Sequence, residues 1–156
     1  MSQIPSRPAS LSTASSAPAI ADRPMPHTSG SRLFLFAMRR MASAGVNDAH
    51  AANALLGNFG KSYRRPLILM RAMMLEFSRV SNRKILVAPC CCHRMTGDEA
   101  RMIRAMTTSR NDPAKAFEDL STLFMETAVL GALTCAQAVA QSYADLGCPI
   151  DLYAEG

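Results

Sequence analysis

The stretch RRPLILMRAMMLEFSRVS, residues 64–81, decides the fold class. Pro66 suits the first turn of a helix, where an N–H group has no intrahelical acceptor. Apolar residues then recur at helical spacing along one stripe: Leu67, Met70, Met74 and Phe77. Other large apolar residues fill most of the remaining circumference. We therefore expect a largely buried helix with Arg71, Glu76 and Arg79 as its solvent-facing edge.

Helix signals continue on both sides of this segment. Further helices are expected over residues 31–45, 48–60, 97–110 and 113–147. The expected start signals are Ser31, Asn47, a capping box of Thr96 and Glu99, and Asp112 followed by Pro113. The short apolar run KILVAP, residues 84–89, is expected to be buried extended chain or the frayed end of the preceding helix, because no second strand offers itself as a partner.

These patterns predict an all-α fold, a single compact bundle of about five helices over residues 31–150. Residues 1–30 hold five of the nine prolines and seven serines, so we expect a disordered tail. Residues 151–156 are expected to be a short C-terminal tail. Translation from Met25 instead of Met1 is an open alternative.

Charge is unevenly distributed along the chain. Residues 31–110 contain fourteen Lys or Arg and four acids, whereas residues 111–156 contain one Lys and seven acids. The basic part could attract nucleic acid through its dibasic pairs Arg39-Arg40, Arg64-Arg65 and Arg83-Lys84. We favour the alternative that it packs beside the acidic last helix and is neutralised there.

Three of the five cysteines are contiguous in VAPCCCHRMTGDEARM, residues 87–102. Cys90, Cys92 and His93 are candidate zinc ligands, because side chains two apart in extended chain point the same way. Their spacing is not the usual Cys-x(2–4)-Cys, and a fourth ligand would have to come from elsewhere. Spacing also excludes the motifs of covalent haem attachment and of dithiol oxidoreductases.

A reactive thiol is the second interpretation of this segment. Cys91 and Cys92, with Arg94 nearby, precede an expected helix N-terminus, and both features favour a thiolate. The interpretation that we favour has no chemistry: the cysteines behave as small apolar residues in a tight, buried loop.

Location and solubility follow from what the sequence does not contain. There is no apolar signal-peptide segment near residue 1, so we expect a reducing cytoplasm and free thiols. Residues 127–144 carry no charge, but their polar side chains and alanines make them a poor membrane span.

The segment from Cys90 to Glu99 carries a Cys-Cys-x-x-Arg-Met-Thr-x-x-Glu core. With it, residues 31–150 resemble a family of small bacterial all-helical proteins of unknown function. The resemblance implies a helical fold and no established activity.

The function expected from sequence is a non-catalytic binding or regulatory module that contacts a protein partner or a second copy, without a cofactor. One alternative is a thiol-redox or zinc module centred on residues 90–93. A second alternative is nucleic-acid binding through the basic middle.

Overall fold

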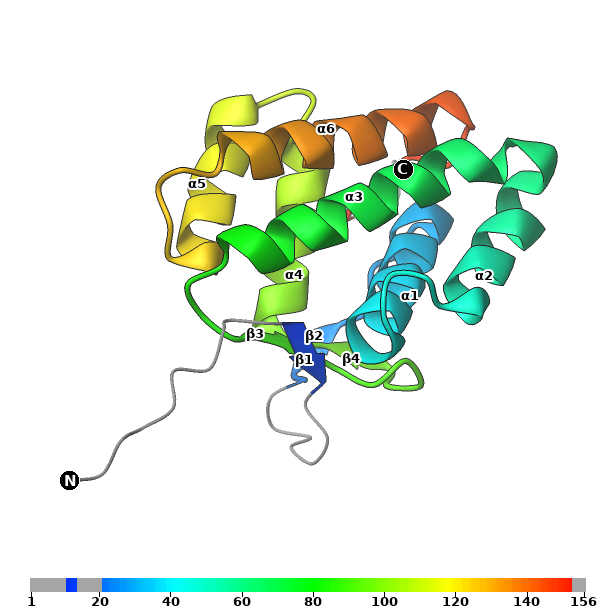
Figure 1. The fold of residues 1–156 in the computed structure, drawn as a ribbon, viewed down its shortest axis with the longest axis horizontal. Helices are drawn as coiled ribbons and strands as arrows, with labels where there is room; N and C mark the ends of the chain where they lie inside the picture. The colour runs from blue at the N-terminus through cyan, green and yellow to red at the C-terminus, as the bar shows by residue number, and fades with distance from the viewer. Residues whose placement is uncertain (1–10, 14–20, 153–156) are drawn as a thin grey trace.

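The computed structural model describes residues 11–13 and 21–152, which form six α-helices (Figure 1). The helices are α1 (Ser29–Ala44), α2 (Ala49–Phe59), α3 (Arg64–Val80), α4 (Gly97–Thr108), α5 (Pro113–Phe124) and α6 (Leu130–Asp145). A short 3-10 helix, η1 (Gly60–Tyr63), joins α2 to α3. The all-α fold class predicted from sequence is confirmed.

Two small pairs of strands tie the N-terminal part to the segment before α4. Strand β1 (Leu11–Thr13) runs parallel to β3 (Ile85–Val87), and β2 (Arg23–Pro24) runs antiparallel to β4 (Arg94–Met95). The expectation that residues 84–89 lack a strand partner is therefore wrong. The partner lies about seventy residues upstream, in a segment whose prolines and serines hide it from pattern analysis.

The expected tail boundary at residue 30 is also wrong. Helix α1 begins at Ser29, and Thr28, not Ser31, caps it by accepting a hydrogen bond from the Ser31 amide. Most of the predicted disordered tail, residues 1–10 and 14–20, lies outside the described residues.

The two ends of the described chain meet beside α1. The Thr28 hydroxyl donates to the Asp151 carbonyl oxygen at 3.0 Å, and the Ser31 hydroxyl donates to the same oxygen. The His27 amide donates to the Leu152 carbonyl oxygen at 3.4 Å. Gly30 allows this approach, because a Cβ atom there would overlap backbone oxygens of Cys148 and Pro149. Residues 151 and 152 thus belong to the folded domain, and 153–156 lie outside the described residues.

Helices α3 and α6 lie side by side with opposite directions across one side of the molecule (Figure 1). The predicted stripe on α3 is buried in the core: Leu67, Met70, Met74 and Phe77. The solvent-facing side of α3 is wider than the expected edge of Arg71, Glu76 and Arg79, because Ile68 and Leu75 are 61% and 59% exposed.

The single helix expected over 113–147 is two helices. Met125 ends α5 in a left-handed conformation with φ of 49°, and α6 starts five residues later. Apolar periodicity continues across the break, because both helices bury one side in the same core. Sequence periodicity alone therefore does not reveal it.

Two of the four expected start signals are present, and the other two, Ser31 and Asn47, are displaced. Thr96 and Glu99 form a capping box, and the Asp112 side chain accepts from the Lys115 amide, with Pro113 in the first turn. The expected cap at Asn47 is wrong: Asp48 caps α2 by accepting from the Ala51 amide.

The acids of the basic middle are engaged by arginines from the same region. The pairs are Arg39–Glu99, Arg40–Asp48, Arg79–Glu76 and Arg83–Asp98. Asp119 on α5 forms ion pairs with Arg101 and Arg104 of α4, and Asp145 on α6 forms one with Arg65 of α3. Only Arg65, Arg101 and Arg104 of the basic part pair with acids of the C-terminal part, so among the described residues these contacts neutralise a small share of the charge asymmetry. None of the helices in the described part of the chain is long and apolar enough to cross a bilayer.

Candidate functional site

A buried arginine lies behind the cysteine segment. Arg39 on α1 is 1% exposed, and its Nε and Nη2 donate to the two carboxylate oxygens of Glu99 at 2.6 and 3.0 Å. Its Nη1 donates to the Cys92 carbonyl oxygen at 2.9 Å, and its Nη2 also donates to the Arg94 carbonyl oxygen at 2.7 Å. The guanidinium therefore fixes the backbone of the segment between β3 and α4 to α1.

Glu99, the partner of Arg39, is fully buried and has a second role at the start of α4. Its Oε1 accepts the Thr96 amide at 2.8 Å, while the Thr96 hydroxyl oxygen accepts the Glu99 amide at 3.0 Å. The Arg39 guanidinium compensates a carboxylate that burial would otherwise make very unfavourable. The Thr-x-x-Glu part of the sequence motif is thus explained by folding.

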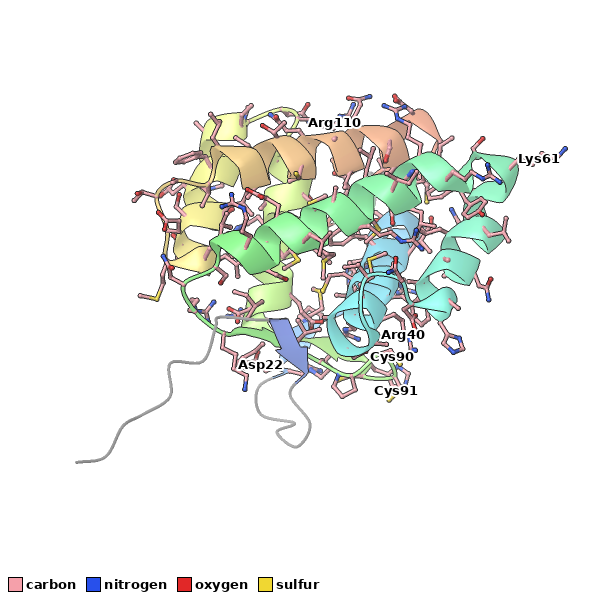
Figure 2. All side chains as sticks on the ribbon, viewed as in Figure 1. Asp22, Arg40, Lys61, Cys90, Cys91 and Arg110 are labelled. Carbon is pink, nitrogen blue, oxygen red and sulfur yellow. The ribbon has the colours of Figure 1, made fainter. Side chains whose placement is uncertain are left out.

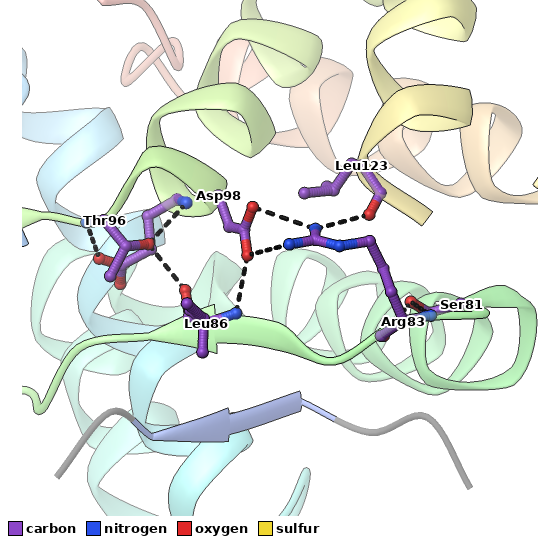
Figure 3. Close-up of polar contacts among 7 residues, drawn as sticks. Ser81, Arg83, Leu86, Thr96, Asp98 and Leu123 are labelled. Carbon is purple, nitrogen blue, oxygen red and sulfur yellow. Dashed lines mark hydrogen bonds and ion pairs between the residues drawn. The ribbon is translucent and has the colours of Figure 1, made fainter. Parts of the chain in front are cut away.

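A second polar network holds strand β3 to the same helix start (Figure 3). The Asp98 carboxylate accepts two hydrogen bonds from Arg83, at 3.0 and 3.1 Å, and one from the Leu86 amide at 2.8 Å. The Thr96 hydroxyl donates to the Leu86 carbonyl oxygen at 2.7 Å, and Arg83 also donates to the Leu123 carbonyl oxygen. The segment that follows β3 is therefore held at both ends.

Between these fixed points, residues 89–92 form a hydrogen-bonded β-turn. The Cys92 amide donates to the Pro89 carbonyl oxygen at 3.0 Å, which places Cys90 and Cys91 at the two central positions. Both side chains are exposed, and Cys92 is half-buried. The favoured expectation that the three cysteines fill a buried loop is therefore wrong. We call residues 89–92 the cysteine turn.

One charged side chain approaches the cysteine turn from α1. Figure 2 shows Arg40 next to Cys90. Arg40 pairs with Asp48 through two hydrogen bonds, at 2.9 and 3.1 Å, and this contact raises the pKa of Arg40; the Cys90 thiol acts in the same direction, more weakly. In return, the hydrogen bond from Arg40 lowers the pKa of Asp48 to about 2.

The cysteine turn differs from both chemical expectations derived from sequence. The cysteines do not lie at a helix N-terminus as expected, because β4 separates Cys92 from the first residue of α4, Gly97. The cation beside a thiol is Arg40, whereas Arg94 extends to the Asp22 carbonyl oxygen at 2.7 Å. Within residues 11–13 and 21–152, no three His, Cys, Asp or Glu side chains form a group that could hold a metal ion, so Cys90, Cys92 and His93 form no preformed zinc site.

The two remaining cysteines lie in other parts of the structure. Cys148 is buried, and its sulfur is 3.6 Å from both the Ser29 hydroxyl and the Asn58 amide nitrogen. Cys135 on α6 is half-buried, and burial together with the negative charge of Glu76 raises the pKa of its thiol. Neither residue is a ligand partner for the turn.

A cavity of about 240 Å³ lies between the N-terminal segment and α4. Its apolar lining includes Met25, Met95 and Leu152. Its two arginines already have acidic partners: Arg104 contacts Asp119 at 2.6 Å and Arg23 lies 3.6 Å from Asp22. We therefore do not place the functional site there.

Comparison with known proteins identifies the family of this chain. The model of a family of unknown function, DUF6628, matches residues 12–145. The chain belongs to this family. The DUF6628 match includes the two strand pairs, the cysteine turn and all six helices to the last residue of α6. No curated protein and no solved structure matches the chain. The family assignment confirms that the chain belongs to a family of unknown function, as the resemblance implied, and it supplies no activity.

The sequence correctly predicts the helix start at Thr96. It does not reveal that Arg39 pairs with Glu99, the other member of the capping box. Arg39 appeared only as half of a dibasic pair that could contact phosphate. One signal was available: Arg39 lies four residues, about one helical turn, after the apolar Leu35, so it falls on the same side of α1, where an arginine requires a buried acceptor. The identity of that acceptor, sixty residues away, required the structure.

Proposed function

We propose that this protein is a non-catalytic binding module, and that its contact surface is the exposed side of α3. The observation that carries the proposal is the exposure of Ile68 and Leu75, at 61% and 59%. These residues are seven positions apart, which is two helical turns, so they lie on the same side of α3. Large aliphatic side chains on one exposed helical stripe are typical of a surface that a partner covers.

The apolar surface extends from α3 onto α6. Leu130, the first residue of α6, is 67% exposed. Gly131 lies so close to α3 that a Cβ atom there would be 2.7 Å from Oε1 of Glu76. Because α3 and α6 pack against each other, we include Leu130 with Ile68 and Leu75 in the proposed contact surface, which we call the α3–α6 face.

Charges at the two ends of the α3–α6 face indicate the kind of partner. Lys61, Arg64 and Arg65 lie at the N-terminal end of α3, and only Arg65 has an acidic contact there, Asp145 at 3.2 Å. At the other end, Arg79 already binds Glu76. We infer an amphipathic helix as the partner, with its apolar side on Ile68 and Leu75 and acidic residues beside Lys61 and Arg64.

The proposal is tested by site-specific photo-crosslinking in the cells that make the protein. A benzophenone amino acid is placed at position 68 or 75, and a control carries it at Asn53, an exposed residue of α2. We expect a discrete crosslinked protein from positions 68 and 75 and none from position 53. Equal products from all three positions would contradict the proposal.

The purified partner then allows a quantitative test. The double variant Ile68→Asp, Leu75→Asp should abolish binding, while Leu56→Asp, which changes an exposed leucine of α2, should leave affinity unchanged. Affinity should fall with rising salt because opposite charges meet at one end of the face. If the crosslinked product is a second copy of this chain, sedimentation must show a dimer that the double variant lacks. Failure of the double variant to weaken binding would overturn the assignment.

A further inference from the structure

The cysteine turn has a chemistry that the proposed binding function does not use. Two thiols, Cys90 and Cys91, are exposed at the tip of a closed turn, and a third, Cys92, follows directly and is half-buried. A structural role for the side chains would place them in the core, as it places Cys148. Here the backbone holds the segment in place and leaves the thiols accessible.

The backbone on one side of the turn is fixed by a group that cannot itself react. Arg39 binds the carbonyl oxygens of Cys92 and Arg94, and it is fixed by Glu99. The Cys92 sulfur is therefore attached to a pinned residue, while Cys90 lies at the solvent-facing tip. Such an arrangement presents the Cys90 and Cys91 thiols to a reagent and holds the Cys92 sulfur two residues from Cys90.

Spacing indicates which thiols can bond to each other. Adjacent Cα atoms are about 3.8 Å apart, which is shorter than the separation in ordinary disulfides, about 4.4–6.8 Å. Cys90 and Cys91 are therefore a poor pair. Cys90 and Cys92 occupy the second and fourth positions of a β-turn, where the chain has begun to reverse, so their Cα separation falls within the usual disulfide range.

Charge indicates the kind of reagent. Arg40 lies beside Cys90, and Arg94 is exposed two residues beyond Cys92. Asp48 pairs with Arg40 and offsets part of its charge, so the attraction for low-molecular-weight disulfides with carboxylate groups comes from Arg40 and Arg94 together, while cationic disulfides are repelled.

We propose that the cysteine turn is a thiol–disulfide exchange site for anionic low-molecular-weight disulfides, in which Cys90 is the attacking residue and Cys92 the resolving one. The Cys90 thiolate attacks one sulfur of the reagent. A bond forms between Cys90 and one half of the reagent, and the reagent's own disulfide breaks. The other half leaves as a thiolate and is protonated by water.

The Cys92 thiolate then attacks the Cys90 sulfur and displaces the second half. A Cys90–Cys92 disulfide results, together with a second small thiol. The two cysteines lose two electrons and two protons, and the reagent gains both as two thiols. No metal or further oxidant is needed.

The probe is 5,5′-dithiobis(2-nitrobenzoate), a dianionic aromatic disulfide, reacted with the full reduced chain. We expect a fast phase at the cysteine turn that releases two coloured thiols for each reagent consumed, and slow reaction at Cys135 and Cys148. The Cys92→Ser variant should release one thiol in the fast phase and retain the other half on Cys90, as detected by mass spectrometry. The Cys91→Ser variant should behave like the unchanged chain.

Charge recognition is tested with Arg40→Gln, using Arg79→Gln as the control, because Arg79 also binds an acid but lies on α3. Arg40→Gln should slow the reaction with the anionic probe several-fold and leave the reaction with cystamine, a dication, unchanged or faster. Circular dichroism confirms that both variants are folded. Trapping of the mixed disulfide by Cys91→Ser instead of Cys92→Ser, or equal rates at Cys135, would overturn the proposal.

Discussion

At the residue scale, the most constrained side chain is Arg39. Its guanidinium links α1 to the cysteine turn through two carbonyl oxygens and to α4 through Glu99. A buried ion pair of this kind adds little net stability over an apolar pair of the same size, yet loss of one member leaves an uncompensated buried charge. The value of the pair lies in the position that it gives to the segment between β3 and α4.

Arg39→Met should therefore lower the free energy of unfolding by about 3–5 kcal/mol, as measured by urea denaturation. Arg79→Met, which breaks an exposed pair with Glu76, should have little effect. The double variant Arg39→Met, Glu99→Leu should recover part of the loss, because it buries no charge. Equal effects of Arg39→Met and Arg79→Met would contradict this account.

Asp48 gives a pH dependence whose sign follows from its lowered pKa. The hydrogen bond from Arg40 holds the pKa at about 2 in the folded protein, against an ordinary value of 3.8. The contribution of Asp48 to stability is thus fully present above pH 3.8 and is lost as pH falls towards 2. Asp48→Asn keeps an N-cap for α2 and removes the pH-dependent contribution of the carboxylate to stability.

The measurement compares thermal unfolding midpoints of the two proteins between pH 5 and pH 2. The midpoint of the original protein should fall more steeply than that of Asp48→Asn in the acid range, with other acids contributing equally to both. Parallel curves would show that Asp48 does not titrate differently in the two states.

At the element scale, the break between α5 and α6 depends on Met125. Its left-handed backbone, with φ of 49°, is unfavourable for a residue with a Cβ atom, and its side chain is 67% exposed. The Asn82 side-chain amide holds the turn by donating to the Met125 carbonyl oxygen at 3.1 Å. The chain thus reverses at a residue that is not a usual helix terminator.

Met125→Gly should raise the free energy of unfolding by up to about 1 kcal/mol, since glycine adopts this conformation without strain and little buried surface is lost. Met125→Ala retains the strain and should bring no gain. Chemical denaturation of the three proteins distinguishes these outcomes. A loss of stability in Met125→Gly would show that the methionine side chain has a packing role.

Helices α3, α4 and α5 show how much of the fold can be predicted from the sequence. The starts of α4 and α5 depend on neighbours within three residues, so Thr96 and Asp112 could be assigned without a structure. The break at Met125 has no glycine or proline to mark it. The exposure of Ile68 and Leu75 depends on where α6 packs, so an apolar pattern alone could not separate these residues from the core.

At the scale of the whole molecule, the candidate sites depend on contacts between distant parts of the chain. The sequence identified the cysteine segment but not its exposure, because exposure follows from Arg39 binding the backbone behind it. The N-terminal strands were missed for the same reason: Arg23 and Pro24 form a strand only because β4 lies beside them.

A substitution at Gly30 tests the contact between the start of α1 and the segment that follows α6. A Cβ atom there meets backbone oxygens that cannot move independently, so Gly30→Ala should lower stability by at least about 1–3 kcal/mol. Gly131→Ala is the matched control, because its Cβ atom meets only the end of the flexible Glu76 side chain. Its effect should be close to zero. Thermal unfolding of both variants measures the difference, and equal midpoints would contradict the proposed closure.

The hydrogen bonds from Thr28 and Ser31 to Asp151 have a consequence for the order of the chain. Because the start of α1 and the segment after α6 are joined at these points, we expect the described domain to fold when a linker runs from Leu152 to the segment before α1 and new ends open between α5 and α6. Such a circular permutant keeps Arg39 facing Glu99 and Ile68 beside Leu75. Folding of such a permutant would show that the domain can be carried as an insert within another protein.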